Sequence, residues 1–128
     1  MQTMLEPWHQ VLKTRDPSGL QTLLADTVVM HSPALHKPIV GKPIVQRYLT
    51  AALHVIANET FRYIREVVDG HEAVLEFECT MDGVHVNGVD MIRFDKSGRI
   101  VDFKVMVRPW KALETLKAVM ADELQNMA

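Results

Sequence analysis

The sequence predicts an α+β fold in which helices cover one face of an antiparallel sheet. In the first half, apolar residues recur at helical spacing, whereas three glycine-containing turns divide residues 61–107 into four strand-like segments. A four-stranded sheet with one apolar face needs a cover, and the helices can provide it. The chain has 128 residues and no internal repeat or linker, so we expect a single domain over residues 1–128.

The first half is expected to contain three helices and one short strand. Asp16-Pro17 is typical of a helix start, residues 27–31 are β-branched and apolar like a strand, and residues 32–42 carry the prolines and glycine of a loop. The first helix places one apolar face at Leu5, Trp8 and Leu12. The third helix has its apolar positions at Ile44, Tyr48, Ala51, Ala52 and Val55.

The second half is expected to form a meander followed by a last helix. Asp69-Gly70 and Asp82-Gly83 are hairpin signals, because tight hairpin turns need the positive φ that glycine adopts easily. Residues 96–98 form a third, slightly longer turn. Pro109 suits the first turn of a helix whose apolar face runs through Leu113, Leu116, Met120 and Leu124.

The strand of residues 88–94 places a carboxylate among apolar side chains. Side chains alternate across a strand, so Asp90 shares a face with Ile92 and Phe94. An ionised carboxylate facing an apolar interior costs several kcal/mol unless it is paired, protonated or opened to a cavity. Gly88, inside the same strand, is typical of a bulge or sharp bend. A bend there would curl the sheet around the helices into a cone with an interior.

Asp90 is therefore the first candidate for acid/base chemistry, because an apolar pocket raises a carboxyl pKa toward neutrality. The alternative is a structural aspartate paired with a Tyr, Trp or Arg. His31 ends the first strand and could orient Asp90 across the cavity mouth, or it could simply cap the strand end.

Aromatic side chains are the candidates for ligand contacts, although the same residue types also fill cores. Phe77 should face inward with Leu75 and Cys79, which leaves Glu76 and Glu78 on the outer face. Arg108 should face outward unless a bulge changes the register, and it could then reach the cavity rim or a partner subunit. The remaining candidates are Trp8, Tyr48, Phe61 and Tyr63, the last two sharing one strand face.

Composition excludes several function classes. A net charge of -2 and a pI near 6.3 give no electrostatic case for nucleic acid or an anionic membrane. No apolar run approaches the roughly 20 residues of a membrane span, and no signal peptide is evident, so we expect a cytoplasmic protein. Neither metal-ligand spacing nor a dinucleotide or phosphate motif occurs, so we expect neither metal nor cofactor.

Several stretches together resemble the nuclear transport factor 2-like superfamily, in its SnoaL-like branch. They are Trp8, residues 23–33, Gly41-Lys42, residues 88–95 and residues 98–103. The resemblance implies a curved antiparallel sheet wrapped around three to four helices, a deep apolar pocket and homodimerisation through the outer sheet face. The superfamily includes cyclases, ketosteroid isomerases, epoxide hydrolases, dehydratases and non-enzymatic binders, so the fold by itself assigns no activity.

The resemblance also places individual residues. Asp90 matches the strand aspartate that SnoaL-like cyclases use as acid/base, but the His that they carry on the preceding strand is absent from residues 73–80. Ketosteroid isomerases keep one pocket aspartate neutral so that it donates a hydrogen bond. Epoxide hydrolases use an Asp-Arg-Asp set, for which Asp90, Arg108 and Asp102 would be the candidates.

Two functions stay open at this stage. One is binding of a small apolar ligand with isomerase-, cyclase- or hydrolase-like chemistry at Asp90. The other is a non-catalytic dimeric module that binds a ligand or a partner. The sequence leaves open whether the protein is an enzyme.

Overall fold

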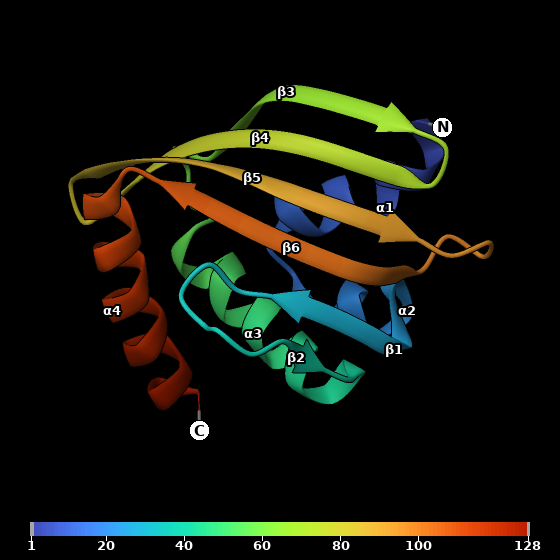
Figure 1. Ribbon diagram of the computed structural model, residues 1–128, viewed down its shortest axis with the longest axis horizontal. Helices are drawn as coiled ribbons and strands as arrows, with labels where there is room; N and C mark the ends of the chain where they lie inside the picture. Colours follow the sequence, from blue (N-terminus) through green and yellow to red (C-terminus); the bar gives the residue numbers. More distant parts are fainter. Residues whose placement is uncertain (1, 128) are drawn as a thin grey trace.

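The structure is a computed structural model that describes residues 2–127, with side chains from Met4 onward. A curved sheet forms one layer, and the helices lie on its concave side (Figure 1). The elements in chain order are α1 (Gln2–Thr14), a 3-10 turn η1 (Pro17–Gly19), α2 (Leu20–Leu23), β1 (Leu24–His31), β2 (Ile39–Val40), α3 (Lys42–Val55), β3 (Arg62–Asp69), β4 (Glu72–Met81), β5 (Val84–Phe94), β6 (Ile100–Arg108) and α4 (Trp110–Asn126). The predicted α+β class is confirmed.

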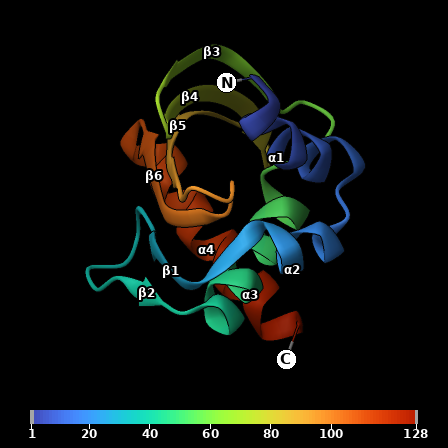
Figure 2. The same ribbon diagram turned by 90° about the vertical axis from the view of Figure 1, so that its right-hand side faces the viewer.

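The six strands are ordered β2-β1-β6-β5-β4-β3. The predicted meander is present as β3 to β6, with antiparallel pairing throughout. The sheet as a whole is mixed, because β1 pairs with β6 in parallel, and β2 forms within the segment predicted to be a loop. Strand β1 joins the sheet by pairing with β6, which is far away in the sequence, and a local turn signal cannot predict such a pairing. In Figure 2 the sheet curls around α1 without closing.

The hairpin turns form where the glycines predicted them. Asp82 and Gly83 both have positive φ, 51° and 76°, as the turn that matches strand twist requires. The register that follows points Leu75, Phe77 and Cys79 inward, and all three are buried as predicted. One face of the meander is therefore core and the other faces outward.

Gly88 does not mark a bulge, and that prediction is wrong. It pairs in regular register with Phe77 on β4 and with Val107 on β6. A Cβ at Gly88 would lie 2.7 Å from the Phe77 ring carbon Cε2 and closer still to Cζ, so the glycine makes room for that ring. The register shifts of the meander lie instead between Tyr63 and Arg65 and between Arg93 and Phe94. Bulges of this kind bend strands and increase local twist.

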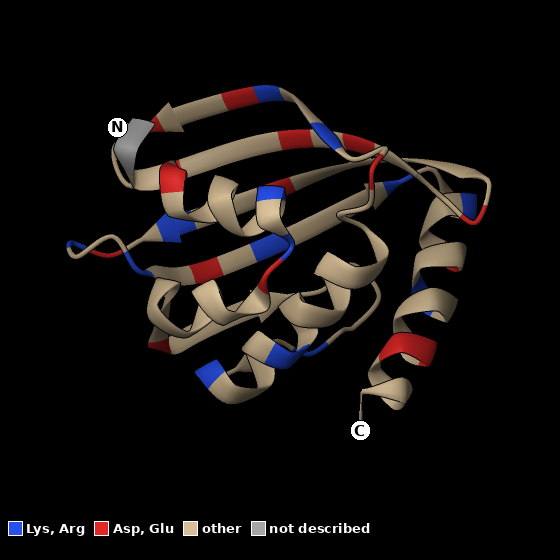
Figure 3. Cartoon of the chain, turned by 180° about the vertical axis from the view of Figure 1, so that it is seen from behind, with Lys and Arg blue, Asp and Glu red and all other residues tan. Residues whose placement is uncertain are grey.

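Helices α1, α3 and α4 cover the concave face of the sheet (Figures 1 and 2). At the predicted helix start, Asp16 Oδ1 accepts a hydrogen bond from the Ser18 amide at 3.0 Å, and a 3-10 turn leads into the short α2. The two signs of charge are unevenly distributed: β4 carries three glutamates and no Lys or Arg, whereas α3 carries Lys42 and Arg47 and no Asp or Glu (Figure 3). Within residues 2–127, no helix combines the length and apolarity that a membrane crossing needs.

Candidate functional site

Asp90 lies on the concave face of β5, in surroundings that disfavour its charge. Its cross-strand neighbours are Leu75 on β4 and Val105 on β6, and only 6 % of Asp90 is exposed. Among the described residues, it is the one polar or charged residue classed as buried. Burial raises the pKa of Asp90 to about 7, although a hydrogen bond from Tyr63 opposes this shift. Both protonation states are therefore populated near neutral pH.

Tyr63 reaches Asp90 from β3, across the intervening strand β4. Its hydroxyl donates to Asp90 Oδ2 at 2.5 Å and accepts a hydrogen bond from the indole Nε1 of Trp8, on α1, at 2.9 Å. Burial, followed by the nearby charge of Asp90, raises the pKa of Tyr63 well above its ordinary value. Tyr63 therefore stays protonated and acts as a donor to the carboxyl group.

The second oxygen of Asp90 faces a cavity. Oδ1 has no hydrogen-bond partner among residues 2–127. It is nevertheless accessible from the cavity, because Asp90 forms part of the cavity wall. The cavity has a volume of about 270 Å³ and lies between the concave face of the sheet and helices α1, α3 and α4. Asp90 thus presents one free oxygen to a largely apolar cavity.

Aromatic rings form much of the cavity wall near Asp90. The rings of Phe61 and Phe77 stack with their centroids 5.2 Å apart, and Trp8 meets Phe103 edge-on at 5.0 Å. The wall also includes exposed residues, among them Leu35 after β1 and Lys117 on α4, and these mark the mouth. A ligand entering there would reach Asp90 between aromatic faces.

Most of the predicted ligand-contact residues come together at this cavity. Trp8, Tyr48, Phe61 and Phe77 line it. Tyr63 faces inward on the same side of β3 as Phe61, and it touches Asp90 rather than the cavity. Contact of any of these residues with a ligand stays a prediction.

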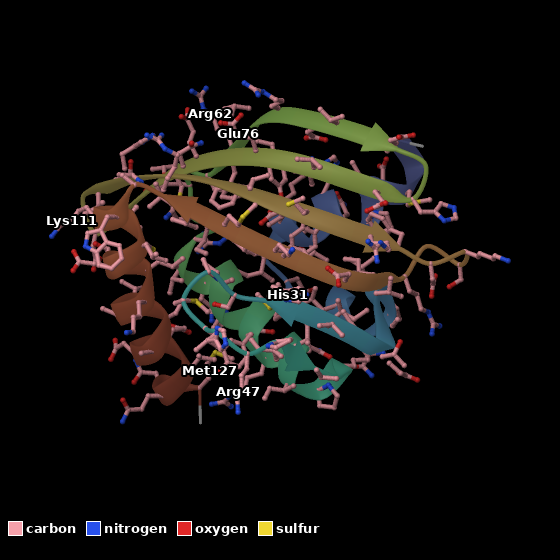
Figure 4. All side chains as sticks on the ribbon, viewed as in Figure 1. His31, Arg47, Arg62, Glu76, Lys111 and Met127 are labelled. Carbon is pink, nitrogen blue, oxygen red and sulfur yellow. The ribbon has the colours of Figure 1, made fainter. Side chains whose placement is uncertain are left out.

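His31 does not orient Asp90, which corrects the sequence-based interpretation. Met30 is the residue of β1 that lines the cavity, and the alternation of a strand turns His31 to the other side. There its Nε2 lies 3.6 Å from Asp102 Oδ2, and both side chains are partly exposed. Figure 4 shows His31 on β1.

Arg108 also lies outside the cavity. The register of β6 points Phe103 and Val105 inward and Arg108 outward, where its Nη1 is 3.5 Å from Asn87 Oδ1. Asp102 shares the outward-facing surroundings of His31. Asp90, Asp102 and Arg108 therefore do not converge, and the Asp-Arg-Asp arrangement is absent from this site.

Several cavity-lining residues were not predicted as site residues. They come from β6, α4 and the segment after β1, and include Phe103, Val105, Leu116, Met120 and Pro33. The apolar periodicity of β6 and α4 was visible in the sequence, but it indicates only an inward face. Whether such a face packs solidly or encloses a cavity depends on distances between elements, which periodicity does not contain.

Comparisons with known proteins agree with this architecture. Residues 5–103 match the SnoaL-like domain. The crystal structure of a steroid delta-isomerase from Pseudomonas aeruginosa is 42 % identical, with a TM-score of 0.91, over 98 % of this chain and 91 % of that one. A protein from Silicibacter pomeroyi DSS-3, described as uncharacterised with a cystatin-like fold, is 31 % identical, with a TM-score of 0.85, over 93 % and 83 %.

More distant structures share the fold alone. A nuclear transport factor 2-like protein of unknown function from Mesorhizobium loti is 22 % identical, with a TM-score of 0.72, over 84 % of this chain and 89 % of that one. No match was found among curated proteins. Because the SnoaL-like domain spans residues 5–103 and two solved structures exceed 30 % identity over almost the whole chain, the protein belongs to the SnoaL-like family of the nuclear transport factor 2-like superfamily.

Proposed function

We propose that the protein binds a small, mostly apolar molecule in the cavity and moves a proton on it through Asp90, in an isomerase-like reaction. The observation that carries the proposal is the free Oδ1 of a buried carboxyl group in an apolar wall. A general acid/base works best when its pKa lies near the operating pH, and burial raises the pKa of Asp90 to about 7. The 42 % identical protein named a steroid delta-isomerase supports this reaction class.

The cavity limits the class of ligand. A volume of about 270 Å³ is near the lower end of ligand pockets, which span roughly 300–1,000 Å³, so the ligand should be small. An anionic group beside Asp90 would meet a buried carboxyl group with no buried cation to offset it in the described part of the wall. The aromatic rings favour a flat ring system. We therefore propose a neutral, ring-containing ketone or alcohol with its oxygen-bearing end near Asp90.

The proposed reaction is the shift of a double bond in a β,γ-unsaturated ketone. Asp90 in its carboxylate form takes the proton from the carbon between the carbonyl and the alkene, and the released electron pair delocalises into a dienolate. The protonated Oδ1 then returns the proton to the γ-carbon, which gives the conjugated ketone and restores the carboxylate. No proton or electron is gained or lost overall, so the step needs no co-reactant.

Non-catalytic binding is the second candidate function. It is favoured by the absence of a second buried acid or base in the cavity wall formed by residues 2–127, since His31 and Arg108 lie outside. A single carboxyl group can hold one polar atom of a ligand without turning it over. The two candidates share a ligand class and differ in turnover.

The test combines a binding signal with a turnover signal. The chain has two tryptophans, and Trp110 is 72 % exposed, so Trp110→Phe leaves Trp8 in the cavity wall as the only indole reporter. Cyclic β,γ-unsaturated ketones, steroidal and smaller, are added to this variant. Trp8 fluorescence reports binding, and ultraviolet absorbance of the conjugated product reports turnover.

We expect binding and turnover, with Asp90→Asn still binding but about 100- to 10,000-fold slower in kcat. Glu76→Gln, which changes a carboxylate on the outer sheet face, is the control and should keep the parent rate. Binding of the ketones without conversion would favour the non-catalytic candidate. Unchanged turnover in Asp90→Asn, or no binding by any ketone, would contradict the proposal.

A further inference from the structure

We propose that Trp8 and Tyr63 are positioning residues: they form a one-way hydrogen-bond chain that occupies Asp90 Oδ2 and reserves Oδ1 for the proton exchanged with the ligand. The inference rests on the proposed function in that it concerns the same oxygen. Its own content, the direction of the chain and its effect on Asp90, can be tested without any ligand.

The direction of the chain follows from the chemistry of its members. The indole Nε1 of Trp8 can only donate, so the Tyr63 hydroxyl must accept at the 2.9 Å contact. A hydroxyl has one proton, and that proton then points to Asp90 Oδ2, 2.5 Å away. Reversing the second bond would leave the Tyr63 hydroxyl with two donors facing it and its own proton without this acceptor.

The direction fixes where the proton of Asp90 resides. Because Oδ2 is always an acceptor, a neutral Asp90 carries its proton on Oδ1, which is the oxygen open to the cavity. When Asp90 ionises, Oδ1 becomes the acceptor while the bond from Tyr63 persists. The same atom therefore gives and takes the proton, as a double-bond shift with one acid/base group requires.

The packing around Tyr63 holds the chain in place. The Tyr63 ring lies edge-on to the rings of Phe61 and Phe77, with centroid distances of 5.1 Å and 6.5 Å. Phe77 in turn occupies the space left by Gly88. Tyr63 is thus confined between Phe61, just before β3, and Phe77 on β4, and these contacts hold its hydroxyl toward β5.

Other titratable groups face this region from every covering element. His9 on α1 has its Nε2 3.2 Å from Glu66 Oε1, on β3, and its ring lies 6.1 Å from that of Tyr63. Tyr48 on α3 and Lys117 on α4 line the cavity. The pKa of Asp90 is nevertheless governed by its burial first and by the Tyr63 hydrogen bond second. A change at Tyr63 should therefore be read directly in the titration of Asp90.

The experiment follows the Asp90 carboxyl carbon by carbon-13 NMR in the ligand-free protein as a function of pH, with the signal assigned by its loss in Asp90→Asn. Tyr63→Phe removes the donor that favours the carboxylate, so we expect the titration to move up by about one to two pH units. Trp8→Phe should move it the same way by a smaller amount, roughly 10–30 % of that shift, because hydrogen bonds in a chain strengthen one another. Tyr48→Phe removes the same hydroxyl from another wall position and should leave it unchanged.

A second measurement does not depend on a packing change. The chain has two tyrosines, so in Tyr48→Phe fluorotyrosine labels only position 63. Fluorine makes the phenol a stronger donor, and the Asp90 titration should move down. An Asp90 titration that stays in place in both Tyr63→Phe and the fluorinated protein would overturn the inference.

The two proposals fail separately. If no ketone is bound or converted but Tyr63→Phe shifts the titration, the proposed function is wrong and the hydrogen-bond chain stands. If ketones are converted but substitutions at position 63 leave the Asp90 titration unchanged, the proposed function stands and the hydrogen-bond chain is wrong. In an active enzyme, the pH profile of kcat/KM should shift upward in Tyr63→Phe along with the titration.

Discussion

Carboxyl groups on the two faces of strands β4, β5 and β6 lie in opposite environments. On the concave face, Asp90 has apolar cross-strand neighbours and one neutral donor, and burial raises its pKa to about 7. On the convex face, Glu78 lies beside Arg62 and Glu76 beside Arg65. Figure 4 labels one member of each pair, Arg62 and Glu76. A carboxyl group is thus buried with a raised pKa on one side and half-buried in an ion pair with an exposed arginine on the other. Environment, and not residue type, singles out Asp90.

Asp95 extends the contrast along the chain. It lies five residues beyond Asp90, in the turn after β5, where its half-buried side chain accepts hydrogen bonds from Ser97 and Arg99. The Ser97 side chain and the Arg99 backbone amide donate to its carboxylate, which lowers the pKa of Asp95. Hydrogen bonds to the charged form dominate at Asp95, whereas burial dominates at Asp90.

The largest expected effect tests this contrast through pH-dependent stability. The pKa of Asp90 is about 7 when folded against roughly 3.9 when unfolded, so the folded state binds the proton more tightly between these values. Stability should fall as pH rises from 4 to 7 and level off above. Asp90→Asn cannot ionise, so its stability relative to the parent should rise by about 4 kcal/mol between pH 4 and pH 8 in urea unfolding.

Asp95→Asn is the matched control for that measurement. A lowered folded pKa stabilises the protein above the unfolded value and loses that effect as pH falls below it, so Asp95→Asn should become relatively less stable only as pH rises toward about 4. From pH 4 to pH 8 its stability relative to the parent should stay level, whereas that of Asp90→Asn should rise. Parallel curves would contradict the assignment of opposite environments.

A smaller effect is expected from filling the space beside Asp90. In Gly88→Ala the new Cβ would meet the Phe77 ring and approach the Met106 carbonyl oxygen to 2.9 Å, so unfolding free energy should drop by about 1–3 kcal/mol. Phe77→Leu in the same chain should recover part of the loss, which a double-mutant cycle measures. Strictly additive losses would show that the ring is not what Gly88 accommodates.

The smallest effect concerns the convex face, through which we propose that the protein forms a homodimer. Strands β3 to β6 carry exposed apolar side chains, namely Ile64, Val67, Val74, Met91 and Met106. Met106→Glu should weaken association about tenfold, or ~1.4 kcal/mol, in analytical ultracentrifugation. Val40→Glu makes the same kind of change on β2, at the sheet edge, and should leave association unchanged. A parent protein that sediments as a monomer at micromolar concentration would exclude the dimer.

Local sequence signals predicted the meander and which face of it is buried. The turns at Asp82-Gly83 and its counterparts require positive φ, and the alternation around Phe77 and Asp90 leaves one register that buries the apolar set. The parallel pairing of β1 with β6 was not predictable in this way, because the paired residues are about 75 positions apart in the sequence. Gly88 was misinterpreted because a glycine within a strand fits both a bulge and a close ring contact, and only the packing of Phe77 distinguishes them.

By itself the sequence determined that one carboxyl group, Asp90, would face the interior, since a strand has a period of two and its neighbours are apolar. Only the tertiary structure decided what Asp90 meets there. Trp8, Tyr63 and Asp90 lie on three separate elements, and sheet curvature brings them into hydrogen-bond contact. The outward orientation of Arg108 followed from strand alternation, but the partner of His31 did not: the pairing of β1 with β6 places Asp102 beside it, because a side chain's partners depend on which elements meet.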